Sequence, residues 1–236
     1  MYRALDADKI IATIDLLQRR IDERFPALDL AAVAGDLSAS ARDTEAKAKA
    51  LARPHILIQL AVSLVIVAFI GLIIFALLNI PAPTNTEATN FVQTLEAIAN
   101  LAVLGGALLL FLVTLQKRIK RHEALKALHQ LRSLVHVMDM HQLTKDPSLV
   151  LGTERVKDTA ASPKRVMTAF ELGRHLDYCS AMLSLTGKVA ALYAQDLDDP
   201  VVVEAVSDIE MLATNLSRKV WQKIAILQAA TLGQLQ

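Results

Sequence analysis

The strongest constraint in this sequence is a run of 25 residues, positions 56–80, that contains no charged side chain. An α-helix rises about 1.5 Å per residue, so this run would be roughly 37 Å long and would cross a hydrocarbon core of about 30 Å. A second uncharged run of 19 residues follows at positions 97–115. Helices that are apolar on every side over such a length are typical of membrane spans. We therefore expect a chain that crosses the bilayer twice.

The placement of Lys and Arg predicts how these two spans are oriented. The connection between them, residues 81–96, is expected to be a short outer loop and has no Lys or Arg, only Glu87 and Glu96. Basic residues instead precede the first span and follow the second: Arg42, Lys47, Lys49, Arg53, Lys117, Arg118, Lys120, Arg121, Lys126 and Arg132. By the positive-inside rule both termini are predicted to be cytoplasmic, in a bacterial inner membrane.

The segment before the first span, residues 1–55, is predicted to form N-terminal cytosolic helices. Asp6 or Asp8 is a candidate cap for a first helix that Pro26 ends, and a second helix is expected from about 28 to 53. The spacing of its apolar residues places Ile10, Ile14, Leu17 and Ile21 on one face of the first helix.

Residues 116–236 are predicted to form a cytosolic helical bundle. The second span is expected to belong to one long helix, about 85 to 145, whose later part is the first helix of the bundle. Thr84–Glu87 has the form of a capping box at its start, and no proline follows until Pro147. A polar loop is expected over 144–161. Ser162-Pro163 and Asp199-Pro200 then predict two helix starts. The expected fold is an all-α membrane protein, with a two-helix transmembrane hairpin, a cytosolic bundle and one very long helix.

Composition argues against several function classes. The chain has 25 Lys and Arg against 24 Asp and Glu, so it lacks the basic excess of a nucleic-acid binder. A single cysteine, Cys179, permits neither an intrachain disulfide nor a cysteine-based zinc cluster. Phosphate-binding loops and hydrolase or metalloprotease signatures are absent from the sequence. We therefore expect a protein that is not an enzyme and that has no cofactor or resident metal.

Two groups of residues near the membrane are candidate functional positions. Polar side chains within the predicted spans either line an oligomeric pore or form hydrogen bonds between helices: Gln59, Ser63, Asn100 and Thr114. A basic collar follows the second span, and it is expected to contact anionic lipid or a phosphate-rich ligand such as a nucleotide: Lys117, Arg118, Lys120 and Arg121.

A third candidate is a polar cluster formed by His136, Asp139 and His141. Asp139 is three residues from His136 and can orient its ring, while His141 points to another face of the helix. One interpretation is a mixed metal site with His175, Asp177 and Cys179, provided that the two helices meet. The other is that these groups form hydrogen bonds between the end of the long helix and the loop after it. His122, His129 and His136 recur every seven residues along one helix face, which is interpreted either as a pH sensor or metal ladder or as a solvated polar face.

Several stretches resemble an uncharacterised family of two-span bacterial inner-membrane proteins with a helical cytosolic region. They are IATIDLLQRRIDERFP (11–26), LKALHQLRSLVHVMDMHQLTKDP (125–147), LDYCSAMLSLTGKVAALYAQ (176–195) and LSRKVWQKIAIL (216–227). The family has no assigned activity, so the resemblance implies membrane location and no catalytic residue. Two-span effectors of nucleotide-signalling antiphage systems, the Hailong type included, are similar only in layout.

Three functions are therefore expected as alternatives. The leading hypothesis is an oligomeric inner-membrane protein that conducts ions or perturbs the membrane under control of its cytosolic bundle. Because two spans cannot enclose a pore, this hypothesis requires a homo-oligomer. The second is a non-conducting scaffold or sensor that docks a soluble protein partner. The third is a nucleotide-gated antiphage membrane effector. All three share the lipid bilayer as a partner and none involves nucleic acid.

Overall fold

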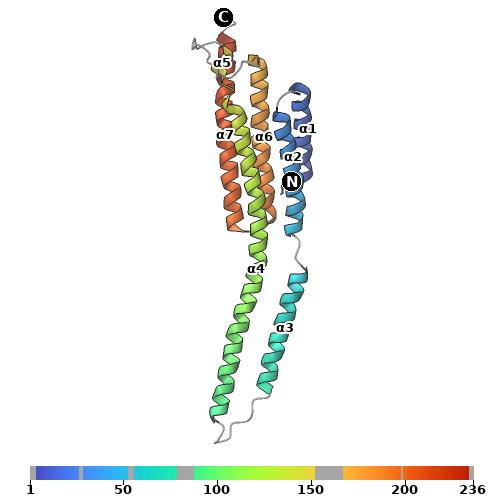
Figure 1. Cartoon of the computed structure of the whole chain (residues 1–236), viewed down its shortest axis with the longest axis vertical. Helices are drawn as coiled ribbons and strands as arrows, with labels where there is room; N and C mark the ends of the chain where they lie inside the picture. Colours follow the sequence, from blue (N-terminus) through green and yellow to red (C-terminus); the bar gives the residue numbers. More distant parts are fainter. Residues whose placement is uncertain are drawn as a thin grey trace. The chain divides into compact units, whose positions relative to one another are not determined.

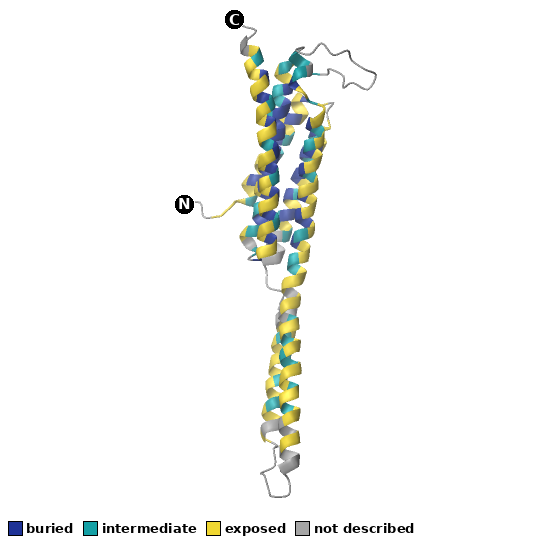
Figure 2. Ribbon diagram, turned by 90° about the vertical axis from the view of Figure 1, so that its left-hand side faces the viewer, coloured by how far each residue is buried: buried dark blue, intermediate teal, exposed yellow. Residues whose placement is uncertain are grey.

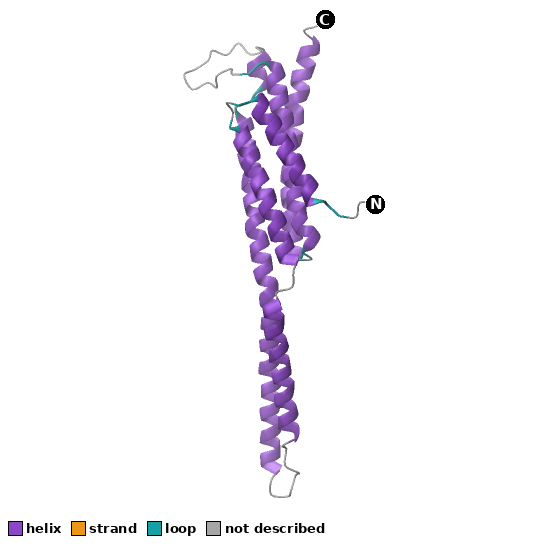
Figure 3. Ribbon diagram, turned by 90° about the vertical axis from the view of Figure 1, so that its right-hand side faces the viewer, coloured by secondary structure: helices purple, strands orange, loops and turns teal. Residues whose placement is uncertain are grey.

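The computed structural model describes residues 4–26, 29–52, 56–78, 88–151, 167–197 and 199–233, and the described residues contain helices and no strand (Figure 3). The helices are α1 (Ala7–Arg24), α2 (Leu30–Ala52), α3 (Ile56–Leu78), α4 (Ala88–Leu143), α5 (Pro147–Leu151), α6 (Ala169–Asp196) and α7 (Pro200–Gly233). The chain divides into two compact units, residues 1–52 with 123–236 and residues 53–122, and α4 contributes to both. The all-helical class expected from the sequence is confirmed.

The first unit is a helical bundle with its own apolar core (Figures 1 and 2). In it, α6 and α7 pack along each other, α1 pairs with α2, and both α1 and α2 contact α6. The predicted stripe of α1 is confirmed, since Ile10, Ile14, Leu17 and Ile21 are all buried. In α4, α6 and α7 the buried residues also recur at three- and four-residue spacing, for example Leu128, Leu131, Val135 and Met138 of α4.

Helix starts in the bundle follow local capping chemistry. Asp6, rather than Asp8, caps α1, because its side chain accepts a hydrogen bond from the Lys9 amide. The predicted start at Asp199-Pro200 is confirmed: α7 begins at Pro200, and Asp199 Oδ1 accepts from the Val201 amide at 3.0 Å. The first helical position suits proline because its amide would have no partner within the helix.

Two expectations for the region after α4 are wrong. The predicted loop over 144–161 contains the short helix α5, whose start at Pro147 is stabilised by the Ser148 amide donating to Asp146 Oδ1 at 2.9 Å. The next helix does not run on from Ser162-Pro163, which lies outside the described residues, but begins at Ala169. Thr168 and Glu171 form a reciprocal capping box there, which supplies partners for two amides that the first turn would otherwise leave unpaired.

The second unit contains α3 and residues 88–122 of α4, which run antiparallel (Figure 1). Half-buried residues at three- and four-residue spacing mark the seam between them: Val62, Val65, Phe69 and Ile73 on α3, and Ile98, Leu101, Gly105, Leu109 and Leu112 on α4. A Cβ atom on Gly105 would lie 2.1 Å from Cε2 of Phe69, so only glycine permits this approach of the two helices. The Thr84–Glu87 capping box lies outside the described residues.

Most apolar side chains of this second unit are exposed (Figure 2), with Leu64 and Val103 each 71% exposed. Over the described part of the chain, the helical stretch Glu96–Leu143 is long and apolar enough to cross a membrane, judged by length and composition alone. A shorter apolar stretch lies at Leu60–Phe75. The structure therefore contains one candidate spanning helix and an apolar helix that packs beside it.

Candidate functional site

The polar residues predicted within the spans are not gathered into one site. Ser63 and Asn100 are exposed, and no hydrogen-bond partner for either side chain is found among the described residues. The Thr114 hydroxyl donates to its own helix, to the Leu110 carbonyl at 2.6 Å and the Phe111 carbonyl at 3.0 Å. The side chain of Gln59 lies outside those that the structure describes. Among the three candidates whose side chains the structure describes, Asn100 therefore has the largest unmet hydrogen-bonding capacity.

The basic collar is a surface feature of α4. Lys117 and Arg118 are exposed, whereas Lys120 and Arg121 are half-buried. Four cations within one and a half helical turns cannot all point the same way, because successive residues are about 100° apart around the axis. The four positions lie within an arc of about 160°, so the collar covers one side of the helix, and that side can contact a surface such as a layer of lipid headgroups.

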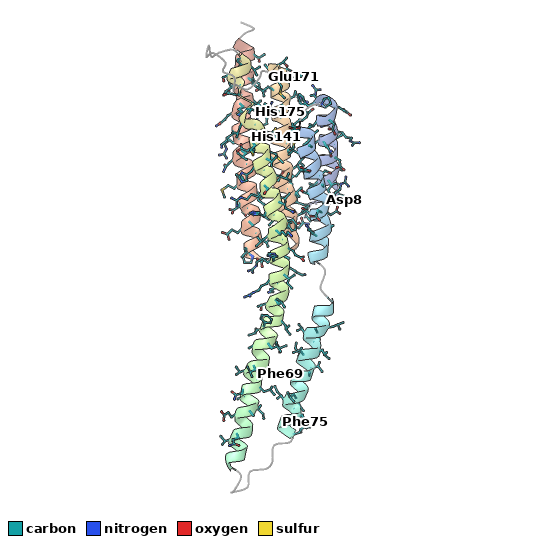
Figure 4. All side chains as sticks on the ribbon, in the orientation of Figure 1. Asp8, Phe69, Phe75, His141, Glu171 and His175 are labelled. Carbon is teal, nitrogen blue, oxygen red and sulfur yellow. The ribbon has the colours of Figure 1, made fainter. Side chains whose placement is uncertain are left out.

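The predicted cluster of His136, Asp139 and His141 is not brought together as one site. His136 is exposed, whereas Asp139 and His141 are half-buried, and His141 instead lies on the wall of a hollow that also contains His175 (Figure 4). Among the described residues, no group of three His, Cys, Asp or Glu side chains is placed to hold a metal ion. The mixed metal site considered from the sequence is therefore not formed by the residues that the structure describes.

The hollow that contains His141 and His175 is the candidate site within the bundle, and we call it the His175 hollow. It has a volume of about 320 Å³. It lies where the start of α2, the end of α4 with the following turn, and the second turn of α6 come together. Its lining residues are Asp29, Leu30, Val137, Met140, His141, Thr144, Lys145 and His175.

His175 is the unusual residue of this hollow. Its side chain is only 2% exposed, and neither Nδ1 nor Nε2 has a hydrogen-bond partner. The Phe25 ring meets the imidazole edge to face at 6.0 Å between centroids and supplies no polar contact. Leaving a buried polar group without a partner costs about 1–3 kcal/mol, so such a residue is rarely retained for packing alone.

The electrostatic surroundings keep this imidazole neutral. Burial, the largest effect, together with the neighbouring Lys145 and His141, lowers the pKa of His175 to about 4. A neutral imidazole has one N–H donor and one nitrogen acceptor. At neutral pH the hollow therefore offers an uncharged hydrogen-bonding ring next to a lysine ammonium group.

A second buried polar group lies close to the hollow. Gln142 is buried, and its side-chain Nε2 has no hydrogen-bond partner. Its backbone carbonyl accepts a hydrogen bond from Lys223 Nζ of α7 at 2.8 Å. Burial lowers the pKa of Lys223, against the opposing effect of the Asp146 and Asp139 carboxylates. Burial raises the pKa of the Cys179 thiol to about 12, so this cysteine is protonated and unreactive at neutral pH.

Part of this site was accessible from the sequence. The stretch from His136 to Pro147 is the densest polar segment, and His175 interrupts the apolar spacing of Leu172, Leu176 and Cys179, which indicates a buried polar side chain. Asp29 and Thr144 were not singled out. No local signal identifies them, because their role depends on the meeting of α2 with the end of α4.

Comparison with known proteins yields no family model, no curated protein and no solved structure that matches this chain.

Proposed function

We propose that the chain is a membrane protein, anchored by a two-span hairpin of α3 and the first part of α4, that holds its helical bundle at the cytoplasmic face as a non-catalytic scaffold or sensor. The observation that carries the proposal is the exposure of apolar side chains on both helices of the hairpin, including Phe75 at 66% and Leu110 at 70%. In water such a surface would be strongly unfavourable, and a hydrocarbon core is the environment that suits it.

The charge distribution supports the orientation. No Lys or Arg occurs from position 54 to 116, while the basic collar begins immediately afterwards at Lys117. Because short loops on the cytoplasmic side carry the excess of Lys and Arg, the bundle and both termini belong to the cytoplasm of a bacterial cell. The collar then lies at the level of the headgroups, where each cation contributes about 1 kcal/mol of attraction to anionic lipid.

A stripe on α4 favours assembly of several copies. Gln93, Asn100, Ala107 and Thr114 are spaced by seven residues, and all four are exposed. Asn100 is five positions from Gly105, so it lies about 140° around the helix from the seam with α3. An amide in hydrocarbon is stabilised by a partner on another helix, and the same residue of a second copy supplies one. We therefore propose a homo-oligomer associated through this stripe.

The same stripe supports ion conduction as a second candidate function. If several copies place Asn100 and Thr114 around a common axis, the polar groups line a narrow path through the membrane. The Thr114 hydroxyl, however, is already bonded to its own helix, which leaves little polar surface for ions. One asparagine in each copy accounts for helix association more directly than for conduction, so the scaffold or sensor is the function that we favour.

Topology is tested by cysteine labelling. In a Cys179→Ala background, Thr86→Cys in the predicted outer loop should react with a membrane-impermeant maleimide applied to intact spheroplasts. Glu23→Cys, on an exposed position of α1, should react only after the membrane is permeabilised. Equal labelling of both sites in intact spheroplasts, or release of the chain from membranes by alkaline carbonate, would contradict the two-span anchor.

Assembly and conduction are separated by two measurements on the chain in lipid nanodiscs and liposomes. The mass of the complex should exceed that of a monomer, and Asn100→Leu should reduce it, whereas Asn90→Leu, near the helix start, is the matched control. Liposome flux should remain at the background level for the scaffold. A flux that Asn100→Leu abolishes would instead establish conduction.

A further inference from the structure

The His175 hollow combines two features that indicate a ligand, and neither depends on the membrane topology. One is its volume of about 320 Å³, open to solvent and lined by the ends of helices distant in sequence. The other is the His175 imidazole, which is 2% exposed and has no partner at either nitrogen. At about 30 Å³ for each water of the liquid, the hollow has the size of roughly ten water molecules, which matches a small organic molecule.

The charge of the wall selects the class of ligand. The Lys145 ammonium group places a positive charge near His175, and this charge disfavours protonation of the ring. Asp29 is the one acidic residue of the wall, and it is exposed and therefore well solvated. A metal cation is disfavoured next to the Lys145 ammonium group, and the described residues provide no set of three ligands for it. Of the charged groups that a ligand can carry, an anion therefore fits this wall better than a cation.

The rest of the wall is apolar. Leu30, Val137 and Met140 contribute aliphatic surface next to the polar groups. An inorganic anion would leave this surface without contacts, whereas a short hydrocarbon part would cover it and displace water from it. The wall thus fits a molecule with an anionic end and an apolar body.

We propose that the His175 hollow binds a small organic anion. Its carboxylate or phosphate group accepts hydrogen bonds from the Lys145 ammonium and from the N–H of His175. Its apolar part contacts the aliphatic wall formed by Leu30, Val137 and Met140. The second ring nitrogen of His175 accepts a hydrogen bond from a hydroxyl of the ligand or from a water that enters with it.

Binding is tested on the full chain in nanodiscs, with ¹³C-labelled histidine and assignment of the His175 signal by His175→Gln. Sodium butyrate and sodium acetate are the probes, titrated at constant ionic strength. We expect both to shift the His175 signal, with butyrate about tenfold tighter because it buries two further methylene groups. Lys145→Gln should weaken butyrate binding about tenfold, as loss of a charged hydrogen bond predicts.

Lys188→Gln is the matched control, since it removes a lysine of the bundle that lies outside this hollow, on α6 beside Ser184. It should leave butyrate affinity unchanged, and the fluorescence of Trp221 verifies that each variant is folded. The proposal is overturned by a His175 signal that does not move at about 50 mM butyrate. It is also overturned by equal affinities for butyrate and acetate, by equal effects of the two lysine variants, or by a response to Zn²⁺ and not to butyrate.

Discussion

The close approach of α3 and α4 at Gly105 gives the sharpest prediction. A Cβ atom at this position would lie 2.1, 2.5 and 2.6 Å from three atoms of the Phe69 ring (Figure 4 shows Phe69). To restore ordinary contact the ring has to move by about 1.3 Å, and such overpacking costs about 1–3 kcal/mol. Gly105→Ala also gains about 0.5–1 kcal/mol because alanine favours a helix. The net loss of hairpin stability is therefore about 0–2.5 kcal/mol.

Gly106→Ala is the matched control, because a Cβ atom there has nothing within 4 Å. It has the same gain in helix propensity without the clash, so the difference between the two variants, about 1–3 kcal/mol, isolates the contact with Phe69. In a Phe69→Ala background, Gly105→Ala and Gly106→Ala should have nearly the same stability, because the ring that clashes with the new Cβ atom has been removed.

The assay is unfolding in mixed micelles by increasing sodium dodecyl sulfate, followed by energy transfer between dyes. In a Cys179→Ala background, the dyes are attached at Leu60→Cys and Leu115→Cys, two exposed positions on α3 and α4. If Gly105→Ala and Gly106→Ala have the same stability within about 0.5 kcal/mol, the reasoning from the seam is wrong.

Three further predictions concern the bundle. Thr168→Ala removes the capping box with Glu171 and should lower the free energy of unfolding by about 1 kcal/mol, measured by denaturant titration, whereas Ser207→Ala at an exposed position of α7 should change it little. The pKa of His175 is lowered from 6.5 to about 4, so its contribution to the free energy of unfolding is complete above pH 6.5 and falls by up to roughly 3 kcal/mol as the pH drops toward 4. When the free energy of unfolding is measured against pH, His175→Gln should lack this loss. Cys179, with a pKa raised to about 12, should resist maleimide in the folded chain and react rapidly once the chain is unfolded; rapid reaction of the native chain would contradict its burial.

Much of the fold was predictable because the relevant signals are local. Apolar spacing identified the buried face of α1, and capping side chains identified the start at Asp199-Pro200 and limited the cap of α1 to Asp6 or Asp8. The start of α6 was missed because Ser162-Pro163 and the sequence from Thr168 to Glu171 both have the form of a helix start. A local pattern does not decide between two competing caps.

The candidate site was less predictable. The sequence brought His141 to His175 only on the condition that their helices meet, and it placed His141 on a different face of α4 from His136. Five positions along a helix separate these two histidines by about 140° around the axis, and the direction of each side chain becomes meaningful only once the neighbouring helices are placed.

The sequence by itself determined the helical class, the two uncharged runs and the buried face of α1, because these depend on residue type and on a period of 3.6 residues. The tertiary structure alone decided that Gly105 meets Phe69, and that Asp29, His141, Lys145 and His175 surround one hollow. These residues belong to segments far apart in the chain. Their meeting depends on how whole helices pack, and no local pattern of residues encodes it.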